Sequence, residues 1–143
     1  MIEVTRLYRF ASSHRLHAPS LSEEENRNLY GKCNNDFGHG HDFILEVRVR
    51  GPIDEYTGLA VDLPALDRLV QRHILGDFHM KYLNEQVPAF TEAVPTSENV
   101  VREIERRLCA HWREAFPSNQ PALDGVRIRE TGKNTFESNR RPQ

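Results

Sequence analysis

The sequence lacks several features that place a protein in a specialised class. Two cysteines, Cys33 and Cys109, are too few among 143 residues for a disulfide framework. No stretch of about 18 apolar residues occurs, so no membrane-spanning helix is expected. The net charge of −2 includes no basic excess of the kind that binds nucleic acid, and the N-terminal residues match neither a signal nor a transit peptide. We therefore expect a cytoplasmic protein that binds neither nucleic acid nor a membrane.

The chain also has no low-complexity segment and no internal repeat. Its length and its content of 38% hydrophobic and 28% charged residues are typical of one globular domain. We expect a single domain over residues 1–143, in which residues 139–143 are frayed.

Hydrophobic patterning predicts two strands in the first third of the chain. Residues 2–13 are rich in β-branched and aromatic side chains, and residues 41–50 alternate between apolar and polar side chains. The polar residues 17–28 are expected to form a loop, and residues 77–95 have no regular pattern.

Two amphipathic helices and a hairpin are predicted in the remainder of the chain. The first helix is expected to begin at Asp62 as N-cap and to end at Gly76, and the second to begin at Thr96 or Ser97. Two further strands are expected to turn at Gly132-Lys133. The order β-β-α-α-β-β predicts an α+β fold with both helices on one face of an antiparallel sheet.

Two histidines continue the apolar row of the second predicted strand. Side chains two residues apart on a strand point to the same face, so His39 and His41 share the face of Phe43. Buried imidazoles need partners, and one zinc ion can bind both rings. His14 has matching parity at the end of the first strand, so pairing of the two strands would complete a three-histidine site with an open fourth position. The alternative is that these are unrelated core or surface histidines.

A cysteine and a glutamate lie in positions that also suit chemistry. Cys33 stands in a polar loop beside Lys32, which together with a nearby dication would lower the pKa of its thiol; the alternative is a small buried apolar side chain. Cys109 lies within a predicted helix and is assigned no chemistry. Glu130 ends an apolar row, where its two oxygens suit two parallel N–H donors of a heterocycle, unless it is an exposed carboxylate at the strand end.

Six motifs occur in a fixed order along the chain, namely "FASSHRL", "YGKCNNDFGHGHDF", "TGLAVDLPAL", "YLNEQVPAF", "PTSENV" and "VRIRET". As a set they resemble the 6-pyruvoyl tetrahydropterin synthases and the related bacterial 6-carboxy-tetrahydropterin synthases. The resemblance extends over nearly the whole chain. It implies a tunnelling fold, with a four-stranded antiparallel sheet and two helices on one side, whose subunits form trimeric barrels that stack into hexamers. It also implies a substrate pocket between subunits.

The resemblance further implies a set of functional residues. The zinc ligands would be His14, His39 and His41, and Cys33 would be the catalytic base. Glu130 would anchor a pterin ring, and Thr96 of "PTSENV" would also contact it. The implied enzyme is a zinc-dependent lyase that acts on 7,8-dihydroneopterin triphosphate and eliminates triphosphate, with no external hydride carrier.

One segment departs from the family pattern. The family has an adjacent Asp-His pair shortly before a "YLN" segment, whereas this chain has "LGDFHMKYLN", in which Phe78 separates Asp77 from His79. We expect His79 to act as the acid/base, with Asp77 able to orient it only if the segment is extended.

Several functions remain open at the level of sequence. Five residues separate Cys33 from His39, which resembles the pyruvoyl-forming enzymes, whereas the 6-carboxy-tetrahydropterin synthases of queuosine precursor synthesis often have a shorter gap. Aldolase-like cleavage of dihydroneopterin is a second enzyme hypothesis. A non-catalytic pterin- or purine-binding homologue is a third, favoured by the altered segment around His79.

Overall fold

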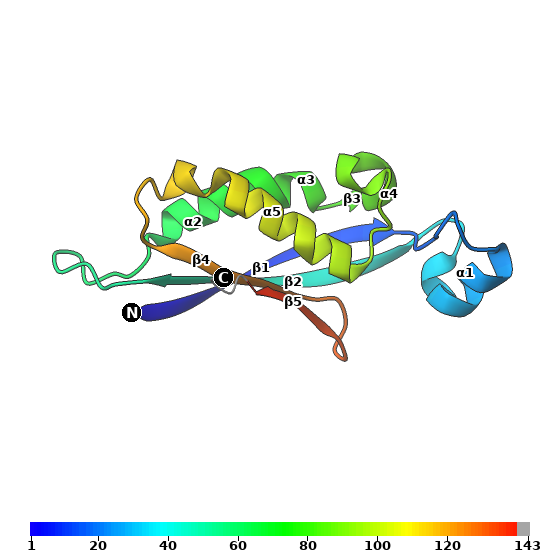
Figure 1. Ribbon diagram of the computed structural model, residues 1–143, viewed down its shortest axis with the longest axis horizontal. Coiled ribbons are helices and arrows are strands. Elements are labelled where there is room, and N and C mark those ends of the chain that lie inside the picture. Colours follow the sequence, from blue (N-terminus) through cyan, green and yellow to red (C-terminus); the bar gives the residue numbers. More distant parts are fainter. Residues whose placement is uncertain (140–143) are drawn as a thin grey trace.

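The computed structural model describes residues 1–139. One sheet of five strands has the order β3-β1-β2-β4-β5, and helices α2, α3 and α5 lie over one of its faces (Figure 1). The strands are β1 (Ile2–His14), β2 (His39–Gly51), β3 (Lys81–Tyr82), β4 (Ala122–Arg129) and β5 (Thr135–Asn139). The predicted α+β class is therefore confirmed. Of the predicted frayed terminus, Asn139 lies in β5 and the rest lies outside the described residues.

The prediction of a four-stranded, purely antiparallel sheet is wrong in one respect. The four long strands are antiparallel, but β3 adds a fifth strand that runs parallel to β1, with Ser12 paired to Lys81 and Ser13 to Tyr82. The amide of Met80 also donates to the carbonyl of Ala11 at 2.6 Å. A strand of two residues is too short to produce an alternating pattern, so its sequence carries no strand signal.

The helices are more numerous than predicted. They are α1 (Glu23–Tyr30), the 3₁₀-helix η1 (Gly31–Asn34), α2 (Leu63–Val70), the π-helix η2 (Gln71–Leu75), α3 (Gly76–Phe78), α4 (Leu83–Gln86), the 3₁₀-helix η3 (Pro88–Phe90) and α5 (Ser97–Ala115). Within residues 1–139, none of them has the length and hydropathy that a bilayer span requires.

Helix α1 lies in the segment predicted to be a loop, and it projects beyond the end of the sheet (Figure 1). The hydroxyl of Ser22 accepts from the amide of Glu25 at 3.1 Å, and the Glu25 carboxylate accepts from the amide of Ser22 at 3.1 Å. This reciprocal capping box starts the helix in spite of its polar composition.

The first predicted helix begins as expected but does not end at Gly76. Asp62 is its N-cap, and its carboxylate accepts from the amide of Ala65 at 3.0 Å. Gly76 has φ −62°, an ordinary right-handed value, and the helical path continues through η2 to Phe78. Phe78 is fully buried and its ring lies 5.9 Å from that of Phe10, so packing in the core carries the helix past the glycine.

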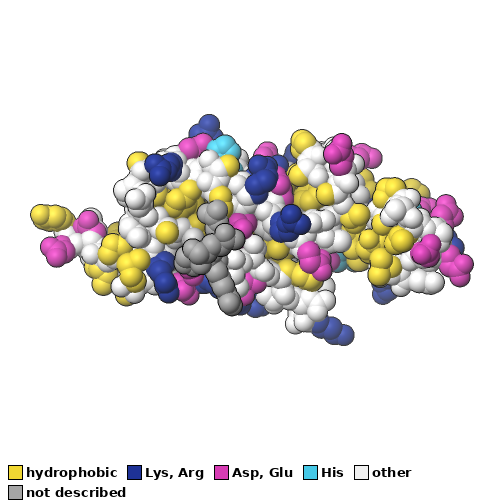
Figure 2. Space-filling view, viewed as in Figure 1, with side chains coloured by type: hydrophobic (Ala, Val, Ile, Leu, Met, Phe, Trp, Pro, Cys, Tyr) yellow, Lys and Arg dark blue, Asp and Glu magenta, His cyan; other side chains and the backbone are white. Residues whose placement is uncertain are grey.

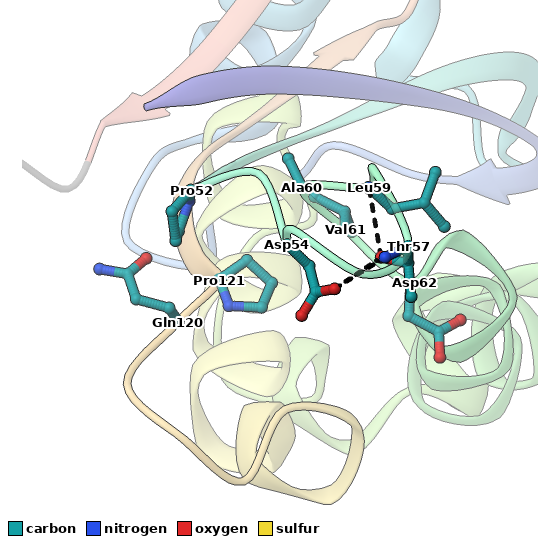
Figure 3. Close-up of a pocket in the computed structure, with 9 residues that line it drawn as sticks. All are labelled: Pro52, Asp54, Thr57, Leu59, Ala60, Val61, Asp62, Gln120 and Pro121. Carbon is teal, nitrogen blue, oxygen red and sulfur yellow. Dashed lines mark hydrogen bonds between the residues drawn. The ribbon is translucent and has the colours of Figure 1, made fainter.

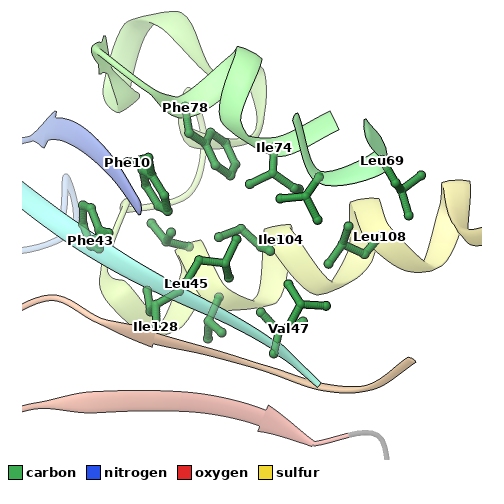
Figure 4. Close-up of a cluster of buried hydrophobic side chains, with 14 of the residues drawn as sticks. Phe10, Phe43, Leu45, Val47, Leu69, Ile74, Phe78, Ile104, Leu108 and Ile128 are labelled. Carbon is green, nitrogen blue, oxygen red and sulfur yellow. The ribbon is translucent and has the colours of Figure 1, made fainter. Parts of the chain in front are cut away.

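The core lies between the sheet and the helices, as Figure 4 shows. The predicted apolar row of β2 is buried, and it packs against the apolar sides of α2 and α5; its members are Phe43, Leu45, Val47 and Val49. Phe10 stacks on Phe43 with ring centroids 4.9 Å apart. Burial of each such side chain contributes roughly 1.5–3 kcal/mol to stability.

The two ends of β2 have different surroundings. Beyond Gly51, the loop before α2 and the segment Gln120–Pro121 enclose a hollow of about 370 Å³ (Figure 3). Asp54 orders this loop, because its carboxylate accepts from the amides of Tyr56 and Thr57, each at 2.9 Å. At the opposite end, β2 begins at His39 and carries the histidines.

Acidic and basic side chains are interspersed on the face seen in Figure 2.

Candidate functional site

Three histidines lie together where β1 ends and β2 begins. In the antiparallel register His14 is opposite His39, and Ser12 is opposite His41. The ring of His41 lies 4.8 Å from that of His14 and 4.6 Å from that of His39, measured between centroids. The strand pairing that the sequence analysis required therefore exists, and it brings the three imidazoles side by side.

His14 is fixed in one orientation beneath the helices. Only 1% of the residue is exposed, and Nδ1 lies 2.8 Å from the carbonyl oxygen of Pro95. Because a carbonyl only accepts, Nδ1 must carry the proton, and the lone pair of the neutral ring is on Nε2. That atom is buried and has no hydrogen-bond partner. Burial lowers the pKa of His14, which favours this neutral form.

His41 presents a second buried nitrogen to the same space. Its Nε2 has no hydrogen-bond partner, although Oε1 of Glu130 lies 2.8 Å away, because the two atoms lack hydrogen-bond alignment. The same oxygen lies 3.6 Å from Nε2 of His14. Burial lowers the pKa of His41, and the negative charge of Glu130 opposes that shift.

Four side chains bring potential ligand atoms within 4.8 Å of one another: His14, Cys33, His41 and Glu130. Imidazole nitrogen, thiolate and carboxylate are the donors that zinc prefers. Two buried Nε2 atoms without partners are costly unless they meet a cation or another donor. The residues present therefore fit a divalent metal. His39 is not a member of this set, and its side chain is exposed.

Glu130 is held by Ser97, a residue expected only as a possible start of the second helix. Ser97, only 3% exposed, donates its hydroxyl to Oε2 of Glu130 in a short hydrogen bond. The neighbouring Thr96 is the N-cap of α5, and its hydroxyl accepts from the amide of Asn99 at 3.2 Å. "PTSENV" is recognisable as a helix start, but nothing in it indicates that Ser97 meets a carboxylate 33 residues later.

Cys33, the member of the four-residue cluster that lies in η1, is partly buried. Burial raises the pKa of its thiol, and the negative charge of Glu130 raises it further. In the chain alone, desolvation and a carboxylate therefore both favour the protonated thiol. The lowering of this pKa by Lys32 together with a dication stays a prediction. The carbonyl of Cys33 accepts from the amide of Leu16 at 2.7 Å, which ties η1 to the segment after β1.

Asp77 and His79 have different partners. Asp77 lies in α3, and its carboxylate accepts from Nη1 of Arg107 at 2.6 Å. His79 follows in extended conformation, and its Nδ1 accepts from the amide of Ala11 at 3.1 Å. Since Nδ1 accepts, Nε2 carries the proton of the neutral ring. The extended segment in which Asp77 would orient His79 is thus replaced by a helical turn.

A hollow of about 500 Å³ adjoins His41 at the sheet edge, between the ends of β1 and β2 and the segment around β3. Gly40 lines it, and a Cβ there would meet no atom within 4 Å, so the glycine leaves open space. Gly38 is constrained instead: its φ is +79°, and a Cβ would lie 3.2 Å from the carbonyl oxygen of His14.

Fold and site together define a protein of the tunnelling-fold class, with a cluster of histidine, cysteine and glutamate at one end of the sheet. Residues 3–141 match the family model described as 6-pyruvoyl tetrahydropterin synthase, and the chain belongs to that family. It is 40% identical over 131 residues to the 6-pyruvoyl tetrahydrobiopterin synthase of Poecilia reticulata, covering 92% of this chain and 85% of that one.

Two further comparisons agree with this assignment. The chain is 43% identical over 98 residues to the 6-pyruvoyl tetrahydrobiopterin synthase of Homo sapiens, which covers 68% of each chain. The solved structure of 6-pyruvoyl tetrahydropterin synthase from Caenorhabditis elegans superposes with a TM-score of 0.86 at 33% identity, covering 98% of this chain and 96% of that one.

Proposed function

We propose that this protein is a zinc-dependent lyase of pterin metabolism. In this proposal it converts 7,8-dihydroneopterin triphosphate with elimination of triphosphate and forms a 6-pyruvoyl product. The observation that carries it is the pair of buried Nε2 atoms of His14 and His41, which lack hydrogen-bond partners and lie beside a thiol and a carboxylate. Family membership and the names of the relatives support the pterin substrate.

The proposed zinc ligands are His14, His39 and His41. Two of the three offer a buried nitrogen without a hydrogen-bond partner, namely Nε2 of His14 and Nε2 of His41. The ring of His39 is exposed and lies 4.6 Å from that of His41, measured between centroids. The hydrogen bond from Nδ1 of His14 to the carbonyl of Pro95 orients that ring, as a carbonyl behind a metal-binding histidine commonly does. Zinc bound there would supply a Lewis acid for the side-chain hydroxyls of the substrate and a positive charge that favours the thiolate of Cys33.

The remaining residues bind the substrate, position the groups that bind it, or move its protons. Cys33, as thiolate, removes a proton from the side chain of the substrate. Glu130 accepts hydrogen bonds from two N–H groups of the pterin ring, and Ser97 holds the Glu130 carboxylate in place. Thr96, the N-cap of α5, also contacts the ring. His79, with its proton on Nε2, serves as the acid/base that returns a proton. Triphosphate leaves, and internal redox of the ring and side chain completes the conversion without an external hydride carrier.

The pyruvoyl product is favoured over the 6-carboxy product of queuosine precursor synthesis. Five residues separate Cys33 from His39, as in pyruvoyl-forming enzymes, and both relatives compared above are named for the pyruvoyl product. We further propose that the enzyme works in the cytoplasm as a homo-oligomer, a trimer or hexamer, with its pocket completed between subunits.

Product identification tests the proposal directly. Zinc-loaded protein is incubated with 7,8-dihydroneopterin triphosphate, and the products are identified by mass spectrometry. We expect triphosphate and a 6-pyruvoyl pterin. Cys33→Ala is expected to lower kcat by about 10²–10⁴-fold, the range for loss of a general base, whereas Cys109→Ala provides a matched cysteine control with unchanged kcat.

The outcomes separate the hypotheses. A 6-carboxy product or side-chain cleavage would assign one of the other two reactions. Binding of pterin and zinc without turnover in the wild type would indicate a non-catalytic homologue. Full activity in Cys33→Ala would remove Cys33 from the mechanism.

A further inference from the structure

A second group of potential metal ligands lies far from the candidate functional site. His73 in η2 and both His111 and Glu114 near the end of α5 bring ligand atoms within 4.8 Å of one another. Ser97, which contacts the first cluster, lies at the start of α5, so the two clusters are separated by roughly 20 Å along the helix axis at 1.5 Å per residue. Neither the proposed reaction nor the family motifs use these three residues.

The imidazoles of His73 and His111 both contact the carboxylate of Glu114. Nε2 of His73 lies 2.8 Å from Oε2 of Glu114, and Nδ1 of His111 lies 2.9 Å from Oε1 of the same carboxylate. The two imidazole rings are stacked, with centroids 3.8 Å apart and an interplanar angle of 8°. Both rings therefore present a nitrogen to the same carboxylate from the same side.

The backbone beneath the cluster is firmly held. His73 lies in the π-helix η2, and short π-helical segments often occur at functional sites. Its carbonyl accepts from Nη1 of Arg107 at 3.1 Å, and Arg107 is in turn paired with Glu103 and Asp77. On α5, His111 and Glu114 are three residues apart and so lie on one face of the helix.

We propose that His73, His111 and Glu114 form a second site for a divalent metal, with Zn²⁺ as the ion that its donors suit best. Two imidazole nitrogens and one carboxylate are a three-ligand set that zinc binds with water in the fourth position. The ion takes the place of the protons that the two rings now share with Glu114. The rings must turn toward each other for their lone pairs to meet. The His111 side chain is 41% exposed, so it has solvent on one side into which it can turn.

The positive charge of Arg72 opposes metal binding at Glu114, but only weakly. Nη1 of Arg72 lies 4.0 Å from Oε2 of Glu114, but the Arg72 side chain is 76% exposed and can move into solvent. The His73 side chain, 15% exposed, gives the site its most ordered ligand. A bound ion would join η2 to the last turn of α5 and so stabilise the packing of these helices.

Counting bound zinc tests this proposal. Zinc-free wild type, His111→Ala, Glu114→Gln and His41→Ala are equilibrated with ZnCl₂ and passed through a desalting column, and zinc per chain is measured by atomic absorption; isothermal titration gives the affinities. Glu98→Gln, on the same helix but outside both clusters, is the control. We expect two zinc ions per chain in wild type and in Glu98→Gln, and one in His111→Ala and in His41→Ala. In Glu114→Gln the second ion is expected to bind at least tenfold more weakly.

The two proposals fail in different ways. If only the functional-site proposal is wrong, wild type binds one zinc and His111→Ala binds none. If the second site is wrong, wild type and His111→Ala bind the same number of ions with the same affinities, even in a large molar excess of zinc. His111 and Glu114 are partly exposed, and circular dichroism of each variant verifies that the comparison is made between folded proteins.

Discussion

Oε1 of Glu130 lies 2.8 Å from Nε2 of His41 without the alignment of a hydrogen bond. A cation bound to the imidazoles of His14 and His41 would occupy the space next to this oxygen. Glu130 must then either join the ligands or direct its carboxylate to the substrate. The anchoring role that we propose requires the second arrangement.

Replacement of Glu130 distinguishes these roles. If Glu130 anchors the pterin ring, Glu130→Gln should leave the zinc content unchanged and raise KM by about tenfold or more, since a hydrogen bond to a charged group contributes roughly 1.5–3 kcal/mol. Ser97→Ala should raise KM in the same direction, because the buried Ser97 hydroxyl holds the carboxylate. Ser118→Ala, in an exposed loop, is the control. Loss of zinc in Glu130→Gln would instead make Glu130 a ligand.

The reactivity of Cys33 should depend on pH in a defined direction. Burial and the negative charge of Glu130 both raise the pKa of its thiol in zinc-free protein. Alkylation by iodoacetamide requires the thiolate, so its pH midpoint should lie above that of a free cysteine. Glu130→Gln removes the charge and should lower the midpoint, while the effect of burial remains. The measurement is made in a Cys109→Ser background, and an unchanged midpoint in Glu130→Gln would contradict the electrostatic explanation.

Asp77 and His79 should contribute unequally to catalysis. Asp77 is paired with Arg107 and its side chain is 58% exposed, so Asp77→Asn should change kcat little and stability by less than about 1 kcal/mol. His79→Ala should lower kcat by about 10²–10⁴-fold if the ring transfers a proton. Steady-state kinetics of both variants provide the measurement. An equal loss in the two variants would mean that Asp77 orients His79 during turnover.

A carboxylate on α2 should make stability depend on pH. Asp67 receives hydrogen bonds from Nη2 of Arg6 at 2.9 Å and from the hydroxyl of Tyr8 at 2.7 Å. The bond from Arg6 lowers the pKa of Asp67 in the folded state. Its contribution is therefore fully present above the ordinary carboxyl pKa and is lost as pH falls through the lowered value.

Urea unfolding of wild type and Asp67→Asn between about pH 6 and about pH 2 checks this sign. Wild type should be the more stable protein near neutral pH, and the difference in free energy of unfolding should shrink in acid. Glu92→Gln, an exposed side chain in the loop before α5, should show no such change. A difference that grows in acid would exclude the ion pair as its cause.

The alternation of side chains along β1 and β2 was sufficient to predict which face of these strands carries the histidines. The parity of His14, His39 and His41 follows from the strand period of two, and their common face is the one that carries Phe43 in the core. Helix α1 was also predictable in principle, because Ser22 and Glu25 have the spacing of a capping box. The polar composition of the segment outweighed that signal.

The remaining features depend on contacts between distant residues. Whether Asp77 lies on a helical or an extended segment is decided by burial of Phe78, which local sequence does not reveal. The role of Ser97 depends on the position of Glu130 after β4. Strand β3 exists because its backbone meets the edge of β1, and two residues carry no period of their own.

Three consecutive residues before and at the start of α5 each perform a separate task. Pro95 orients His14, Thr96 caps the helix, and Ser97 restrains Glu130. An insertion or deletion of one residue in the loop that precedes them would shift all three contacts at once. The loop between Gly51 and Asp62, at the far end of the sheet, has no such tie to the histidines. In natural or engineered versions of this chain, changes of length should accordingly be tolerated in the loop between Gly51 and Asp62. In the loop before Pro95 they should be selected against.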